Sequence, residues 1–122
     1  MTKTRLIPDD THPITVEPSA GQVRIRAGDT IVADTSRALI LQEADYPPVA
    51  YVPRDTVDQS LLRPSRTTSH CPYKGDASYY DLVTPDGVIE DAAWSYEEPY
   101  NAVYEIGGYL AFYPDKVVIT VS

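Results

Sequence analysis

The side chains best suited to chemistry lie close together between residues 67 and 80. This stretch contains the chain's single cysteine, Cys71, one of its two histidines, His70, and the lysine Lys74. A cysteine nucleophile needs a neighbouring cation, base or helix N-terminus that stabilises its thiolate. Lys74 could supply that cation if the turn at Pro72 folds its side chain back toward Cys71. Cys71 and Lys74 are therefore candidate catalytic residues.

The alternative for Cys71 is a packed, unreactive thiol, because cysteine is among the most frequently buried residue types. His70 is a poor base for Cys71, since adjacent side chains of an extended chain point to opposite faces. The sequence favours the packed thiol and leaves the nucleophile as an alternative.

Other catalytic or cofactor patterns are absent. Structural zinc needs four cysteine or histidine ligands, and the chain has one cysteine and two histidines, which are far apart in sequence. Gly107-Gly108 lacks the further glycines and the Lys-Ser/Thr of a phosphate-binding loop. The paired carboxylates Glu90-Asp91 and Glu97-Glu98 are adjacent to turns and are interpreted as solvated surface. We therefore predict no metal and no cofactor.

A mixture of aromatic and polar side chains suggests a binding pocket. If the strands that carry them lie side by side, aromatic walls with a few polar groups result, as in small-molecule sites. The candidate ligand-binding residues are Tyr51, Arg54, Thr68, Tyr79, Trp94 and Tyr96. The alternative is a tyrosine-rich core with satisfied hydroxyl groups.

Length and charge limit the classes of function. A chain of 122 residues suits a single domain, and its net charge of −8 disfavours nucleic-acid binding. No apolar run approaches the roughly 20 residues that cross a bilayer. A single cysteine excludes an internal disulfide, and no signal-peptide core is present, so a cytoplasmic location is expected.

The pattern of elements predicts a mainly β (α+β) protein. Residues 1–13 form an extended lead-in, and residues 14–122 form one domain. Alternating apolar residues and turn signals predict strands over residues 14–17, 23–27, 30–34, 37–43, 49–52, 77–83 and 88–96. A closing hairpin is expected over 109–121, and two short helical pieces over about 55–61 and 99–106.

Four ordered blocks carry a family resemblance across residues 20–121. They are Tyr51-Val52-Pro53-Arg54-Asp55-Thr56-Val57, Thr68-Ser69-His70-Cys71-Pro72-Tyr73-Lys74-Gly75-Asp76-Ala77-Ser78-Tyr79-Tyr80, Ala93-Trp94-Ser95-Tyr96-Glu97-Glu98-Pro99 and Ile106-Gly107-Gly108-Tyr109-Leu110-Ala111-Phe112-Tyr113. With these blocks the chain resembles the small bacterial and fungal family called domain of unknown function 427.

The resemblance implies a β-tent type of fold, in which two antiparallel sheets meet at an angle over a cavity. That fold is shared with methionine-R-sulfoxide reductases, Yippee-like proteins and the thalidomide-binding domain of cereblon. Those relatives often hold zinc through two Cys-x-x-Cys pairs, which this chain lacks, as it lacks the reductases' C-terminal catalytic cysteine. The resemblance therefore implies the fold and no activity.

Three hypotheses of function follow. The first is a ligand-binding domain whose pocket opens between two sheets and takes an anionic or carbonyl-bearing small molecule, because Arg54 and Lys74 are exceptional charges in an acidic chain. The second is an enzyme that uses Cys71 as nucleophile with Lys74 or His70 assisting. The third is a protein-interaction module or homodimer that uses an exposed sheet edge.

Overall fold

The computed structural model describes residues 4–122, which form ten strands and three short 3₁₀ helices. One antiparallel sheet has the order β1-β4-β5, with β1 at Ile14–Pro18, β4 at Leu39–Glu43 and β5 at Val49–Tyr51. A second has the order β10-β2-β3, with β10 at Val118–Val121, β2 at Val23–Ala27 and β3 at Thr30–Thr35. The third has the order β6-β7-β8-β9, with β6 at Leu62–Cys71, β7 at Gly75–Thr84, β8 at Gly87–Ser95 and β9 at Ala111–Phe112.

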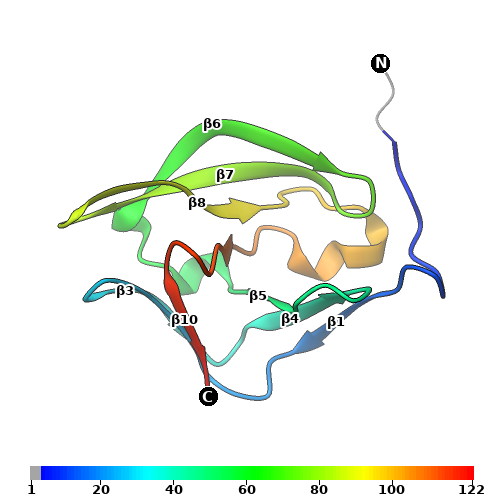
Figure 1. The fold of residues 1–122 in the computed structure, drawn as a ribbon, viewed down its shortest axis with the longest axis horizontal. Helices are drawn as coiled ribbons and strands as arrows, with labels where there is room; N and C mark the ends of the chain where they lie inside the picture. The colour runs from blue at the N-terminus through cyan, green and yellow to red at the C-terminus, as the bar shows by residue number, and fades with distance from the viewer. Residues whose placement is uncertain (1–3) are drawn as a thin grey trace.

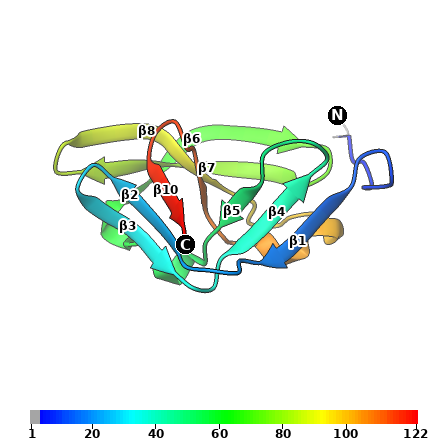
Figure 2. The same cartoon turned by 60° about the horizontal axis from the view of Figure 1, so that its bottom comes forward.

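The sheets form two layers. The long strands β6, β7 and β8 make one layer, and the two three-stranded sheets lie opposite them (Figure 1). In the second view these two smaller sheets lie side by side, with their edge strands β10 and β5 toward one another (Figure 2). The predicted mainly β class is confirmed, but there are three sheets, not two.

Local patterns predicted most strands correctly. The hairpin of β2 and β3 forms around Gly28, whose φ of 57° is a conformation that glycine adopts without steric cost. The strands predicted over residues 77–83 and 88–96 correspond to β7 and β8, which pair through the turn before Gly87.

The predicted hairpin over residues 109–121 is wrong. Its first half, β9, pairs with β8, and its second half, β10, pairs with β2 at the other end of the chain. The alternation of apolar residues indicates that a segment is a strand, but it does not specify the strand with which that segment pairs. The C-terminal strand therefore closes a different sheet from the one that its sequence neighbours join.

The predicted helical pieces are short 3₁₀ turns. The first divides into η1 (Arg54–Thr56) and η2 (Gln59–Leu61), where the Asp58 carboxylate accepts a hydrogen bond from the Ser60 amide at 3.0 Å. The second is η3 (Asn101–Ile106), which directs Val103 and Ile106 into the core. The helix signals were real but too short to build α-helices.

Strand β6 was not predicted, because Pro64 lies within it. Proline cannot donate to a sheet ladder and is tolerated on edge strands and at bulges. β6 is the edge of its sheet, and its pairing with β7 shifts register between Pro64 and Thr68.

Two clusters of buried residues fill the interior. One is centred on β2, β3 and the residues Val52, Leu82 and Phe112. The other contains Tyr51, Tyr96, Leu41 and the inward residues of η3, with Cys71, Tyr79 and Trp94 packed against it. None of the helices within residues 4–122 has the length and apolar character needed to span a membrane.

Candidate functional site: a tyrosine-lined cavity around Lys74

A cavity of about 230 Å³ lies beside the second cluster. It is lined by eleven residues, five of them tyrosines: Leu41, Glu43, Tyr46, Pro47, Val49, Tyr51, Lys74, Tyr79, Trp94, Tyr96 and Tyr113. These residues come from β4, β5, β7, β8 and the segments next to them. The cavity thus lies between the two layers and draws its walls from both.

Strand pairing builds the aromatic wall. Tyr79 of β7 lies directly opposite Trp94 of β8, so the two side chains share one face of the sheet. Tyr96 follows Trp94 by two residues and returns to that face. Trp94 also packs against Tyr113, with ring centroids 4.6 Å apart. Residues far apart in sequence therefore form one continuous surface.

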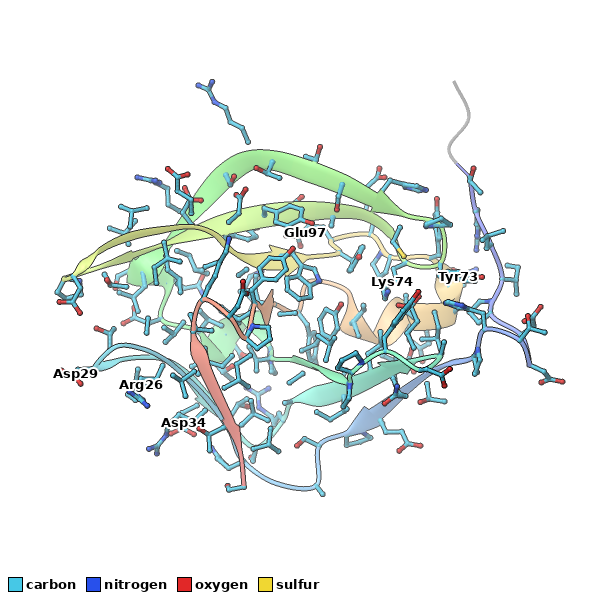
Figure 3. All side chains as sticks on the ribbon, in the orientation of Figure 1. Arg26, Asp29, Asp34, Tyr73, Lys74 and Glu97 are labelled. Atoms are coloured by element: carbon cyan, nitrogen blue, oxygen red, sulfur yellow. The ribbon has the colours of Figure 1, made fainter. Side chains whose placement is uncertain are left out.

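Lys74 is held in the turn that joins β6 to β7. Its amide donates to the Cys71 carbonyl at 3.3 Å, and its own carbonyl accepts from the Tyr100 amide at 2.9 Å. The side chain is buried and extends between the layers, where its ammonium forms an ion pair with the Glu43 carboxylate of β4 (Figure 3). The Lys74 Nζ also lies 3.7 Å from the Cys71 Sγ. One ammonium therefore connects the turn, the opposite sheet and the thiol.

Glu43 accepts from two cationic or potentially cationic partners. Its second oxygen lies 2.8 Å from the Nε2 of His12, whose ring stacks on Tyr73 with centroids 4.1 Å apart. Burial by itself would raise the pKa of Glu43, but the hydrogen bonds from Lys74 and His12 outweigh it and lower that pKa. Glu43 is therefore anionic at neutral pH and balances the charge of Lys74.

The tyrosine hydroxyl groups of the cavity are neutral donors. Burial raises the pKa of Tyr51, Tyr96 and Tyr113 above the ordinary value of 10.0. The Trp94 Nε1 donates to the Tyr51 hydroxyl at 3.2 Å, which leaves the Tyr51 proton available. The Tyr79 hydroxyl is 2.9 Å from the Ser69 hydroxyl.

The Tyr96 hydroxyl differs from those of Tyr51 and Tyr79, which have hydrogen-bond partners. The Tyr96 side chain lines the cavity and the residue is only 7% exposed, yet within residues 4–122 its hydroxyl has no hydrogen-bond partner. In the same described part of the chain, no fully buried side-chain nitrogen or oxygen lacks a partner. The Tyr96 hydroxyl therefore opens into the cavity space, where a ligand atom or water would satisfy it.

Five of the predicted site residues come together here: Tyr51, Lys74, Tyr79, Trp94 and Tyr96. Cys71 is not part of the cavity lining. It packs against the second buried cluster, and its Sγ contacts the Lys74 Nζ.

Arg54 and Thr68 lie elsewhere. Arg54 donates to Glu97 at 2.6 Å and lies over the Tyr80 ring, 5.2 Å from its centroid. Because Tyr80 follows Tyr79 on β7, it points to the opposite face. Arg54 therefore does not line the cavity that contains Lys74.

Thr68 and His70 are on the outer side of β6. Thr68 is exposed and alternates with Ser69, which contacts Tyr79. The His70 ring bonds the Thr4 carbonyl at 2.7 Å and Asp76 at 2.8 Å. His70 is thus engaged away from Cys71, as the alternation of adjacent side chains predicted.

Sequence reasoning missed Glu43, Tyr46 and Tyr113 as lining residues. The one available signal was the position of Glu43 at the end of the apolar run Leu39–Leu41, where a charged side chain continues an inward-facing strand. Nothing local connects Glu43 with Lys74. Among residues 4–122, no group of three or more histidine, cysteine and acidic side chains is arranged to hold a metal ion.

The fold and the cavity define a small mainly β protein with an aromatic-walled chamber beside the buried side chain of Lys74. Residues 15–122 match the model of the family described as Domain of unknown function (DUF427), so the chain belongs to that family. The match covers essentially the whole predicted domain. No curated protein is significantly similar to the chain.

Proposed function

We propose that this protein is a small-molecule-binding domain whose ligand places a neutral carbonyl group in the cavity beside Lys74. The observation that carries the proposal is the Tyr96 hydroxyl, which opens into the cavity space and has no hydrogen-bond partner among residues 4–122. A carbonyl oxygen would accept from this hydroxyl and from the Lys74 ammonium, which has three protons and two neighbours, Glu43 and Cys71.

The charges of the cavity favour a carbonyl over an anion. The positive charge of Lys74 is already balanced by Glu43, and the chain as a whole has a net charge of −8. A carboxylate ligand would approach Glu43 in a partly buried setting, where like charges repel more strongly than in water. A neutral acceptor gains the hydrogen bonds without that repulsion.

The test uses a matched pair of probes, cyclohexanone and cyclohexanecarboxylate. Trp94 is the single tryptophan and lines the cavity, so its fluorescence reports binding directly. We expect the ketone to bind more tightly than the carboxylate. Tyr96→Phe should weaken ketone binding about threefold to tenfold, the usual worth of one hydrogen bond.

Arg54→Met is the matched control, because it removes a cation outside the cavity. It should leave ketone affinity unchanged, whereas Lys74→Met should lower it. Equal affinity of the wild type, Tyr96→Phe and Lys74→Met for the ketone, with all three proteins folded, would overturn the proposal.

A second candidate function is an enzyme with Cys71 as nucleophile, and the observation in its favour is the 3.7 Å separation of the Lys74 Nζ from the Cys71 Sγ. A neighbouring ammonium stabilises a thiolate. In this case iodoacetamide should alkylate the folded wild type faster than folded Lys74→Met at neutral pH. Reaction of Cys71 only after addition of denaturant would leave the thiol with a packing role alone.

A further inference from the structure

A second, larger hollow of about 820 Å³ adjoins the cavity. The two share part of their lining: Glu43, Tyr46, Pro47, Val49 and Trp94. The cavity at Lys74 is smaller than the roughly 300–1,000 Å³ of typical ligand pockets, whereas the adjoining groove reaches that range. The two spaces are therefore adjacent at these five residues, which we call the shared mouth.

The groove is apolar and lies between two sheet edges. Ile40 of β4 and Ala50 of β5 are directly paired, so both face the same side of their sheet. Ile119 and Val121 of β10 line the groove and, being two residues apart, share a face of their strand. Figure 2 shows β10 and β5 as neighbouring edges of the two smaller sheets.

Charge is confined to one end of the groove. Among residues 4–122, Glu43 is the single acidic or basic residue that lines it, and Glu43 belongs to the shared mouth and is paired with Lys74. Away from the mouth the walls are aliphatic residues, prolines and Phe112. Val121 is 55% exposed although it is apolar, so this end of the groove is open to solvent in the described chain.

We propose that the ligand is amphipathic, with a carbonyl head in the cavity at Lys74 and a single uncharged apolar chain along the groove between β5 and β10. The inference rests on the proposed function and adds the ligand class, such as a medium-chain ketone, amide or ester. The shared mouth at Trp94 and Tyr46 is where head and chain join. The polarity of the two spaces sets the direction, because beyond the residues that both spaces share, only the cavity has donors among residues 4–122, at Lys74 and Tyr96, that a ligand can use.

The experiment measures the affinity of straight-chain methyl ketones from butanone to decanone by Trp94 fluorescence. Each added methylene should tighten binding about fourfold until the chain exceeds the groove, as expected for burial of one methylene group. Val121→Asp should reduce this dependence on chain length for the longer ketones.

Val118→Asp is the matched control. Val118 lies on the same strand and is 46% exposed, but it does not line the groove. The same charge is thus introduced on β10 without entering the groove, and the ketone series should be unaffected.

The outcomes separate the two proposals. If butanone binds and longer ketones bind no better, the groove is not a chain site and this inference is overturned, while the proposed function stands. If long ketones bind equally well to the wild type and to Tyr96→Phe, the head is not in the cavity and the amphipathic assignment fails. If no ketone of any length perturbs Trp94, the proposed function itself fails.

Discussion

Lys74 and Glu43 form a buried ion pair in which each charge compensates the other. Both side chains are more than four-fifths buried, with 11% and 14% of their surfaces exposed. Breaking a buried pair by removing one partner leaves the other charge uncompensated, which costs more than the pair contributes. The pair Arg54–Glu97 is of the same type but has 34% and 44% exposed. The two pairs therefore form an internal comparison.

We predict that Glu43→Gln lowers the free energy of unfolding by about 3 kcal/mol, since Lys74 remains buried without its counter-charge. Glu97→Gln, the control, should cost less than about 1 kcal/mol because its pair is exposed. Urea denaturation measures both. Equal losses in the two variants would show that burial does not distinguish them.

The turns at the two ends of β7 each contain a glycine with a positive φ. The β6–β7 turn ends at Gly75, whose φ of 110° is rarely adopted by other residues, and a Cβ there would meet the Glu98 carbonyl oxygen at 3.5 Å. The β7–β8 turn has a similar residue in Gly87, with φ of 133°, but a Cβ there would meet nothing within 4 Å. Only the first of these turns positions Lys74.

We therefore predict that Gly75→Ala and Gly87→Ala each cost about 1–3 kcal/mol of stability through backbone strain. Ketone binding should weaken in Gly75→Ala alone, because displacement of the β6–β7 turn moves the Lys74 ammonium relative to Tyr96. Stability is read from urea denaturation and binding from Trp94 fluorescence. Weakened binding in both variants would mean that general destabilisation, and not the position of Lys74, limits affinity.

At the scale of the whole molecule, the tyrosines couple stability to alkaline pH. Burial raises the pKa of Tyr51, Tyr96 and Tyr113 in the folded state, so between pH 10.0 and the folded pKa the unfolded chain binds fewer protons than the folded one. The contribution of these tyrosines to the free energy of unfolding is therefore fully present below pH 10.0 and is lost as the pH rises toward their folded-state pKa.

We predict that a titration followed by tyrosinate absorbance resolves two classes among the ten tyrosines. Tyr51 and Tyr96 are expected to ionise only with global unfolding, because burial raises the pKa of both hydroxyl groups. Circular dichroism over the same pH range identifies the unfolding step. Complete ionisation of all tyrosines before any loss of structure would contradict the burial of the cavity.

Local sequence was sufficient for most strands and for part of the site. Alternation of apolar residues is a property of a few consecutive positions, so the strands from β1 to β5 and β7 to β8 could be predicted from it. The residues Tyr79, Trp94 and Tyr96 were recognisable because they occur in short, distinctive blocks. Pro64 concealed β6, because a bulged edge strand tolerates a residue that normally excludes strands.

Only the tertiary structure decided which strands pair and which side chains from distant segments come into contact. Whether β10 pairs with β9 or with β2 depends on long-range packing, and that choice creates the groove. Likewise, Glu43 reaches Lys74 across 31 residues, while Arg54, a cation in the same family block as Tyr51, turns to Glu97. Sequence by itself determined the β class, the family and four of the aromatic residues that line the cavity, because these follow from local pattern and motif. The buried ion pair, the open Tyr96 hydroxyl and the groove arise only when distant strands are brought together, because charge pairing and cavity shape depend on distances in space and not on spacing along the chain.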